Sequence, residues 1–215
     1  MNITKEIWEI EVEREVNELY PGVSALSIGV KTFNKKDYNL DKALKQVASK
    51  IGYNLDNLKD IPKIRAYRDF YWRMGIDPTK QRPASEALVR RLLSKGSIPK
   101  ISFIVDAGNL ASIETLIPIG IYDTRFIKGP LRLRLAREGE VFVDITGKER
   151  KLGKRDIVLS DNEGPLHVFP YRDSFRTRVR EDTEEVYVVA CGVKGIEKED
   201  LKEALERVCY WLRNL

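Results

Sequence analysis

Polar residues that can bind a ligand follow an apolar run near the middle of the chain. In residues 101–105, ISFIV, Ile101, Phe103 and Val105 are apolar and β-prone, which predicts a buried strand. Asp106, Gly108 and Asn109 come directly after it. The end of a strand is where a loop can present side chains to a ligand, so we expect a binding site there.

A second group of polar side chains lies in residues 169–177, FPYRDSFRT, between two predicted strands. Arg172 and Arg176 carry forked donors for a carbonyl or phosphate oxygen, and the carboxylate of Asp173 can bind an ammonium group. The segment therefore predicts another portion of a binding site. The alternative is a charged surface loop with internal ion pairs.

The single histidine, His167, has an ordinary pKa that suits a general base. Its neighbours Leu166 and Val168 are predicted to face the core, so His167 should point to the other face of its strand. A purely structural or surface role is the alternative. Ser85 and Glu86 also carry polar groups, for which capping of the helix that starts near them is the alternative to a role in the site.

Composition narrows the classes of function. The chain has 215 residues, 42% of them hydrophobic, and no apolar run long enough to cross a bilayer. One histidine and the distant Cys191 and Cys209 cannot build an ordinary zinc site, and no glycine-rich phosphate loop is present, so we expect no metal and no cofactor. Two cysteines suit buried thiols better than a disulfide framework. We expect no signal peptide, no membrane partner and a cytoplasmic location.

Charge gives weaker indications. The formal net charge is +5 and charged residues make up 33% of the chain, a profile that suits a heat-adapted source. A basic surface favours an anionic partner such as RNA but is also common among soluble proteins.

The elements that must position these residues read as an α+β pattern, with helices before a strand-rich centre. Residues 1–60 are expected to form an N-terminal segment, and residues 61–215 a core with a C-terminal helix, in a single domain. Helices are predicted over 40–51, 61–74, 82–93 and 198–213; residues 6–19 suit either a helix or a strand over 9–12. Strands are predicted at 26–33, 101–105, 131–135, 141–145, 157–160, 166–169 and 186–190. Gly96 should end the third helix, and Thr146–Gly147 should form a hairpin turn.

The order and spacing of several motifs resemble a known family. Asn109 is followed at fixed distances by Pro118 and by Tyr122–Asp123, and residues 82–91, RPASEALVRR, read like an entry helix. Further matching pieces are Leu131–Arg134, Gly139–Glu140, Gly164–Pro165, Ser174 and Thr183. Together they resemble the B3/B4 domain, the amino-acid editing domain of the phenylalanyl-tRNA synthetase beta subunit, in a free-standing form. The resemblance implies a mixed, mostly antiparallel fold.

That family hydrolyses the ester between a wrong amino acid and the terminal ribose of tRNA, in a reaction that is similar to substrate-assisted catalysis without a protein nucleophile. The resemblance therefore implies a trans-acting deacylase for mischarged aminoacyl-tRNA, which binds the aminoacylated 3′ end and its amino-acid moiety. The alternative is a non-catalytic module that binds an amino acid, RNA or a synthetase partner. A stand-alone phenylalanine–tRNA ligase is not expected, because the chain shows no adenylate-forming motif region.

The resemblance also assigns roles to residues. Asn109, Asp173 and His167 are the expected catalytic groups, and Arg82, Arg172 and Arg176 are the expected RNA contacts. The expected substrate contacts are Gly108, Gly120, Asp123, Ser174 and Val189. These groups should converge on one cleft, close to Asp123 and to the start of the helix at residues 82–86.

At four of the five pocket positions of the family, this chain has a different residue. Gly108 stands where the family has Thr, Gly120 where it has His, Asp173 where it has Gly, and Val189 where it has the Glu that recognises a tyrosine hydroxyl. Only Asn109 is kept. An apolar Val189 cannot make that hydrogen bond, so tyrosine should not be the amino acid recognised.

Overall fold

A computed structural model of the protein describes residues 3–215, so the first two residues of the expected N-terminal segment lie outside the described residues. The fold is the mixed, mostly antiparallel α+β arrangement that was expected. The helices are α1 Arg14–Leu19, α2 Leu40–Ala48, α3 Pro62–Arg73, α4 Ala84–Lys95, α5 Phe103–Thr115 and α6 Lys198–Asn214, with 3₁₀ turns η1 Leu58–Asp60 and η2 Thr124–Phe126. The strands are β1 Ile3–Glu9, β2 Glu11–Val12, β3 Ser24–Lys31, β4 Ile119–Asp123, β5 Arg132–Leu135, β6 Val141–Val143, β7 Glu149–Lys151, β8 Ile157–Ser160, β9 Pro165–Val168, β10 Arg172–Asp173 and β11 Glu185–Gly192.

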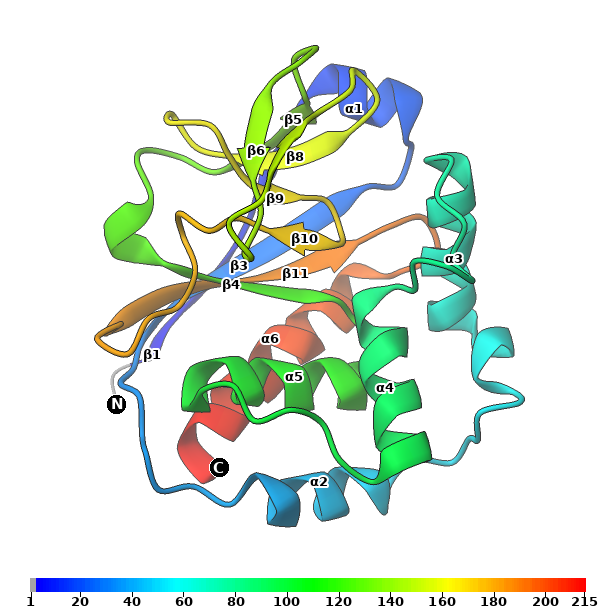
Figure 1. The fold of residues 1–215 in the computed structure, drawn as a ribbon, viewed down its shortest axis with the longest axis vertical. Helices are drawn as coiled ribbons and strands as arrows, with labels where there is room; N and C mark the ends of the chain where they lie inside the picture. The colour runs from blue at the N-terminus through cyan, green and yellow to red at the C-terminus, as the bar shows by residue number, and fades with distance from the viewer. Residues whose placement is uncertain (1–2) are drawn as a thin grey trace.

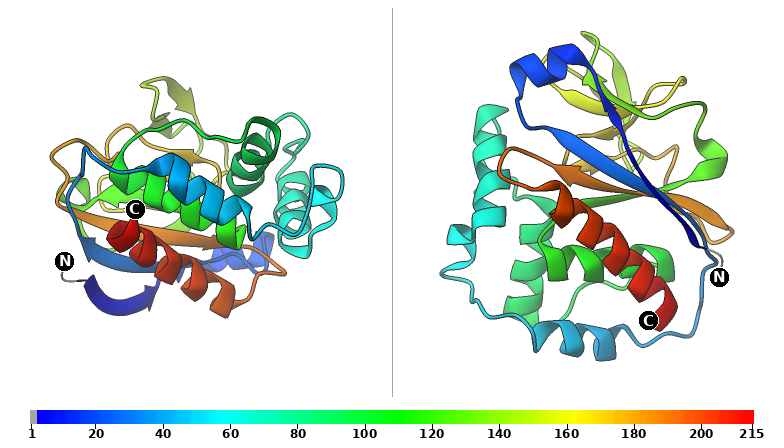
Figure 2. Two further views of the ribbon diagram at one scale, coloured as in Figure 1. Left: turned by 90° about the horizontal axis from the view of Figure 1, so that it is seen from below. Right: turned by 180° about the vertical axis from the view of Figure 1, so that it is seen from behind.

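The molecule is built in three layers. An antiparallel sheet with the strand order β1-β3-β11-β4 forms the middle layer. Helices α5 and α6 cover one face of this sheet, and a second sheet, β10-β9-β8-β5-β2, lies against its other face (Figure 1). Only the β2–β5 pair of the second sheet is parallel. Figure 2 shows the same stacking from below and from behind.

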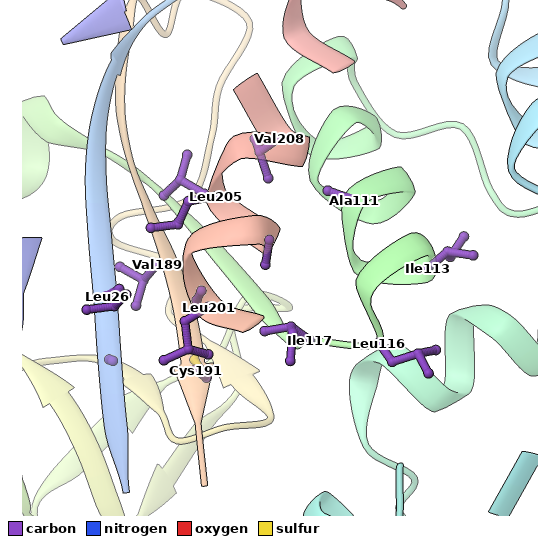
Figure 3. Packing of buried hydrophobic residues seen from close by; sticks show 14 of the residues in the cluster. Leu26, Ala111, Ile113, Leu116, Ile117, Val189, Cys191, Leu201, Leu205 and Val208 are labelled. Carbon is purple, nitrogen blue, oxygen red and sulfur yellow. The ribbon is translucent and has the colours of Figure 1, made fainter. Parts of the chain in front are cut away.

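Burial of α6 against the middle sheet confirms the predicted C-terminal helix. Leu201, Leu205 and Val208 recur at helical spacing and are fully or almost fully buried, as Figure 3 shows beside residues of β3 and β11. Cys191 and Cys209 are buried free thiols, as expected. No helix within residues 3–215 is long and apolar enough to cross a membrane.

The predicted strand at 101–105 is wrong, because the chain forms α5 there. The Ser102 side chain caps this helix by accepting a hydrogen bond from the Val105 amide at 3.4 Å. Helix α5 is buried nearly all round by α2, α4, α6 and β4, so apolar residues occur on all its faces and no helical stripe is visible. Consequently Asp106, Gly108 and Asn109 lie on a helix and not at the end of a strand.

Several local predictions are confirmed. Gly96 ends α4 with a φ of 69°, and Gly147 forms the turn between β6 and β7 with a φ of 85°. Most expected strands are present, but β1, β4, β7 and β10 were not predicted. The N-terminal segment contains β1, β2 and the short α1, so the long helix over 6–19 is wrong, and of the alternative strand over 9–12 only Glu11–Val12 forms a separate strand. Ser85 does not cap α4, because Pro83 occupies the capping position and Ser85 is buried inside the first turn.

Candidate functional site

A cleft of about 840 Å³ lies between α5, the edge strand β4 and the loop at residues 174–184. Gly108 and Asn109 of α5 line it together with Asp173 at the end of β10. The expected meeting of Asn109 with Asp173 is therefore confirmed, although the two residues are far apart in sequence. A Cβ at Gly108 would come within 2.5 Å of the Ile121 side chain, so glycine permits the close approach of α5 to β4.

Apolar side chains form one side of the cleft wall. They are Ile119 and Ile121 of β4, Val105 of α5, Ile145 after β6 and Val179. Ile119 and Ile121 alternate along β4 with Gly120 and Tyr122, so the two isoleucines share one face of the strand. This wall gives the cleft an apolar surface beside the polar groups of Asn109 and Asp173.

Asp173 is held by the histidine of the neighbouring strand. His167 of β9 and Asp173 of β10 are cross-strand partners, and His167 Nδ1 lies 2.8 Å from Asp173 Oδ1. An ionised carboxylate only accepts hydrogen bonds, so Nδ1 is the donor of this bond. The His167 side chain is buried, whereas that of Asp173 is 37% exposed. His167 thus lies behind the carboxylate that lines the cleft.

Cationic side chains surround the cleft. Lys35, Lys36, Lys100, Arg178 and Arg180 line it, against the two carboxylates of Asp173 and Glu181. Among the described residues, none of these five cations forms an ion pair within 4.0 Å. Burial and the neighbouring charge of Arg178 lower the pKa of Arg180. The cleft is therefore positively charged and suited to an anionic ligand.

Internal contacts fix the lysine side of the cleft. The Tyr38 hydroxyl donates to Asp106 of α5 at 2.6 Å, which ties the loop after β3 to the start of that helix. Burial raises the pKa of Asp106, and burial together with the Asp106 charge raises the pKa of Tyr38. Lys100 lies 3.9 Å above the Tyr38 ring, and Lys35 lies 4.6 Å from the Phe103 ring. These cation–π contacts place both ammonium groups at the cleft.

Two expected substrate contacts lie behind the cleft wall. Gly120 of β4 and Val189 of β11 are cross-strand partners, and Val189 is 1% exposed. A Cβ at Gly120 would collide with the hydroxyl of Tyr122, which is fully buried and packs edge-on against the His167 ring. Burial and the Asp173 charge raise the pKa of Tyr122. The Tyr122 side chain therefore occupies the space beside Gly120.

The remaining predicted site residues do not line the cleft. Asp123 is buried and accepts hydrogen bonds from Arg125 and Thr183, and Ser174 is buried against Thr177. Arg172 pairs with Asp144 at 2.9 Å, and Arg176 pairs with the buried Asp161 at 2.8 Å. Arg82 is exposed just before α4. The expectation that Asp123 and Arg172 belong to the same cleft as Asn109 is wrong, since their charged groups serve internal ion pairs.

Sequence reasoning missed the cations that do line the cleft. Lys35, Lys36 and Lys100 lie in loops without a motif, and charged residues are so frequent in this chain that these three do not stand out. Arg178 and Arg180 alternate with Val179 directly after the segment 169–177. Extending that segment by three residues would have included both arginines.

Within residues 3–215 no group of three or more His, Cys, Asp or Glu side chains is arranged to hold a metal ion. The polar side chains that line the cleft are the amides of Asn34 and Asn109, the hydroxyls of Tyr38 and Ser102, the carboxylates of Asp173 and Glu181, and the five cations.

Comparison with known proteins places this arrangement in a family. The model of the B3/4 domain family matches residues 66–215, and the chain belongs to this family. It is 29% identical over 116 residues to the phenylalanine–tRNA ligase beta subunit of Thermobifida fusca, covering 54% of this chain and 14% of that protein. It is 32% identical over 108 residues to the same subunit of Bartonella henselae, covering 50% and 13%. The chain thus spans about a seventh of the length of these relatives.

The fold has a counterpart among solved structures. An N-terminal fragment of the phenylalanyl-tRNA synthetase beta subunit from Pyrococcus horikoshii superimposes with a TM-score of 0.50 and 16% identity. The match covers 99% of this chain and 52% of the fragment. At this identity the likeness concerns the fold alone.

Proposed function

We propose that this protein binds the aminoacylated 3′ end of a tRNA and hydrolyses the ester of a wrong amino acid. The observation that carries the proposal is the meeting of Asn109 and Asp173 in one cleft that is surrounded by five cations without carboxylate partners. An aminoacylated RNA end offers the matching groups, namely an ammonium, an ester carbonyl and phosphates. Membership of the B3/4 domain family supports this choice.

Each portion of the ligand has a counterpart in the cleft. The α-ammonium group pairs with the Asp173 carboxylate, whose orientation His167 fixes from behind. The amino-acid side chain lies on Ile119 and Ile121. The Asn109 amide donates to the ester carbonyl, where negative charge develops as water attacks. The RNA phosphates lie near the lysines and arginines of the rim.

The hydrolysis needs no protein nucleophile. A water oxygen bonds to the acyl carbon, the bond from that carbon to the ribose oxygen breaks, and the ribose oxygen takes up a proton. Asn109 stabilises the oxyanion, while His167 acts as a positioning residue because its Nδ1 is committed to Asp173 and its Nε2 is buried. The ribose hydroxyl next to the ester remains available to orient the water, as in a substrate-assisted reaction.

The buried His167 Nε2 also favours a second candidate function. Because His167 Nε2 is buried and does not reach the cleft as a base, the same cleft suits a module that binds the aminoacylated end without cleaving it. In that case the protein would protect or deliver its ligand, or hold it for a synthetase partner.

Incubation with a complete panel of mischarged tRNAs separates the two functions. We expect release of the amino acid from at least one member, with tyrosyl-tRNA of the phenylalanine acceptor spared, because Ile119 and Ile121, on which the amino-acid side chain lies, offer no polar group to a tyrosine hydroxyl. The control is Asn109→Ala, which should lose release but keep binding. Tight binding without release from any member would sink the hydrolase and support the binding module.

A further inference from the structure

An apolar surface leads from the β6–β7 hairpin to the cleft. Val141, Val143 and Ile145 alternate along one strand, and each is more than one third exposed. The strand continues past β6, since Ile145 N donates to Asp173 O and Phe175 N donates to Val143 O. These bonds place the half-exposed Phe175 beside Val143 and Ile145.

Arg178 lies flat on Phe175. Its guanidinium carbon is 3.4 Å from the ring centroid, and its Nη1 donates to Phe175 O at 2.6 Å, which fixes the planar group in this position. Arg178 and Ile145 also line the cleft, so the apolar surface and the cleft are continuous. The result is a flat, positively charged platform at the mouth of the cleft.

We infer that the Phe175–Arg178 platform, with Ile145 beside it, binds an unpaired nucleobase. A base has a large planar face that stacks on an aromatic ring or a guanidinium plane, and the phosphates that accompany it suit the nearby Arg180 and Lys35. A buried apolar peptide would leave these cations without partners. The inference rests on the proposed function and extends it, because it assigns the terminal base of the RNA to the Phe175–Arg178 platform.

The spacing along the strand supports this assignment. Asp173 and Phe175 are two residues apart on an extended segment, so their side chains lie on one face about 6.6 Å from each other. The terminal ribose and its ester bridge a similar span between the ammonium group and the base. When the α-ammonium group of the ligand is bound at Asp173, the terminal base therefore lies at Phe175.

The test uses the complete chain and a short single-stranded RNA that ends in CCA, without an amino acid, with 2-aminopurine as the terminal base. Stacking on the platform quenches 2-aminopurine fluorescence, and anisotropy of a 5′ label gives the affinity. We expect quenching by the wild type, and for Phe175→Ala an affinity lower by about 5-fold to 100-fold with loss of quenching. Phe175→Trp should keep both. Arg178→Lys should lower the quenching while retaining most of the salt dependence.

Trp72→Ala is the matched control, because Trp72 is a similarly exposed aromatic residue on α3 and does not line the cleft. Unchanged affinity and quenching in Phe175→Ala, at an unchanged melting temperature, would overturn the inference, as would equal affinity for an RNA that lacks the terminal base. These readouts use uncharged RNA and are independent of ester hydrolysis. If no mischarged tRNA is deacylated but the terminal base still stacks on the platform, only the proposed hydrolase activity is refuted, and the base-binding inference stands.

Discussion

Replacing Asp173 by Asn is the substitution that isolates the charge of the cleft carboxylate. The asparagine Oδ1 can still accept the hydrogen bond that His167 Nδ1 now donates at 2.8 Å, so the local structure is retained. The substitution removes only the negative charge that, in our proposal, pairs with the α-ammonium group of the ligand. The change therefore tests the electrostatic role of Asp173 without creating a cavity.

The size of the effect follows from the exposure of the site. A hydrogen bond between charged groups contributes about 1.5–3 kcal/mol, and the 37% exposure of the Asp173 side chain places this one in the lower half of the range, at about 1.5–2 kcal/mol. Since ~1.4 kcal/mol corresponds to a factor of ten, affinity should fall about 10-fold to 30-fold. The melting temperature should change by no more than about 2–4 °C, the shift for ~1 kcal/mol in a chain of this size.

Calorimetric titration with a non-hydrolysable 3′-aminoacylamino-adenosine measures this loss directly. Asp182→Asn is the control, because Asp182 lies on the loop that follows β10, is exposed, pairs with Arg125 and does not line the cleft. An uncharged analogue that lacks the α-amino group should bind wild type and Asp173→Asn equally. Equal affinities of the two proteins for the complete analogue would refute the assignment of Asp173 to the ammonium group.

Four further predictions concern the surroundings of the cleft. Asp123→Ala should lower the free energy of unfolding, measured by urea denaturation, by about 3 kcal/mol. The reason is that the substitution leaves Thr183 and the half-exposed Arg125 without their buried partner. A loss below ~1 kcal/mol would contradict this. Ion pairs and hydrogen bonds lower the pKa of Asp123, Asp161 and Asp144, the last to about 2, so these three carboxylates should cause a loss of stability as the pH falls from about 4 to about 2. Stability that does not fall over this range would exclude this cause. Gly120→Ala should destabilise the protein by about 1–3 kcal/mol, because the new methyl group collides with the Tyr122 hydroxyl. Adding Tyr122→Phe to this variant should restore some of the lost stability. Additive effects of the two substitutions would show that the two side chains do not meet. Exhaustive chelation with EDTA should leave ligand binding and activity unchanged, and restoration of a lost activity by added zinc or magnesium would show a metal site that we have missed.

Amphipathic helices, and helix ends and turns that need a glycine, could be predicted from the sequence. Helix α6 exposes charged residues on one side, and Gly96 and Gly147 adopt left-handed conformations that few other residues tolerate. Helix α5 could not be predicted, because a helix buried on nearly every side has no polar face to reveal its period, and the run from Ile101 to Val105 is as rich in β-prone apolar residues as a buried strand. Strand β4 was missed because residues 106–123 were interpreted as a loop that follows the mistaken strand.

The site was predicted incompletely. Family spacing identified Asn109 and the segment around Asp173, and both line the cleft. It could not show that Arg172 and Arg176 pair with Asp144 and Asp161, since the acidic partners come from distant loops. Nor could it show that Lys35 and Lys100 lie at the cleft, because tertiary contacts such as the Tyr38–Asp106 hydrogen bond bring them there.

A crystal structure with the 3′-aminoacylamino-adenosine analogue bound tests the central claim most directly. The account predicts the ammonium group within hydrogen-bond distance of Asp173, the acyl carbonyl at the Asn109 amide and the amino-acid side chain on Ile119 and Ile121. An analogue bound between the two sheets beside Gly120 and Val189, with Tyr122 displaced, would contradict it. So would an analogue bound outside the cleft at millimolar concentration.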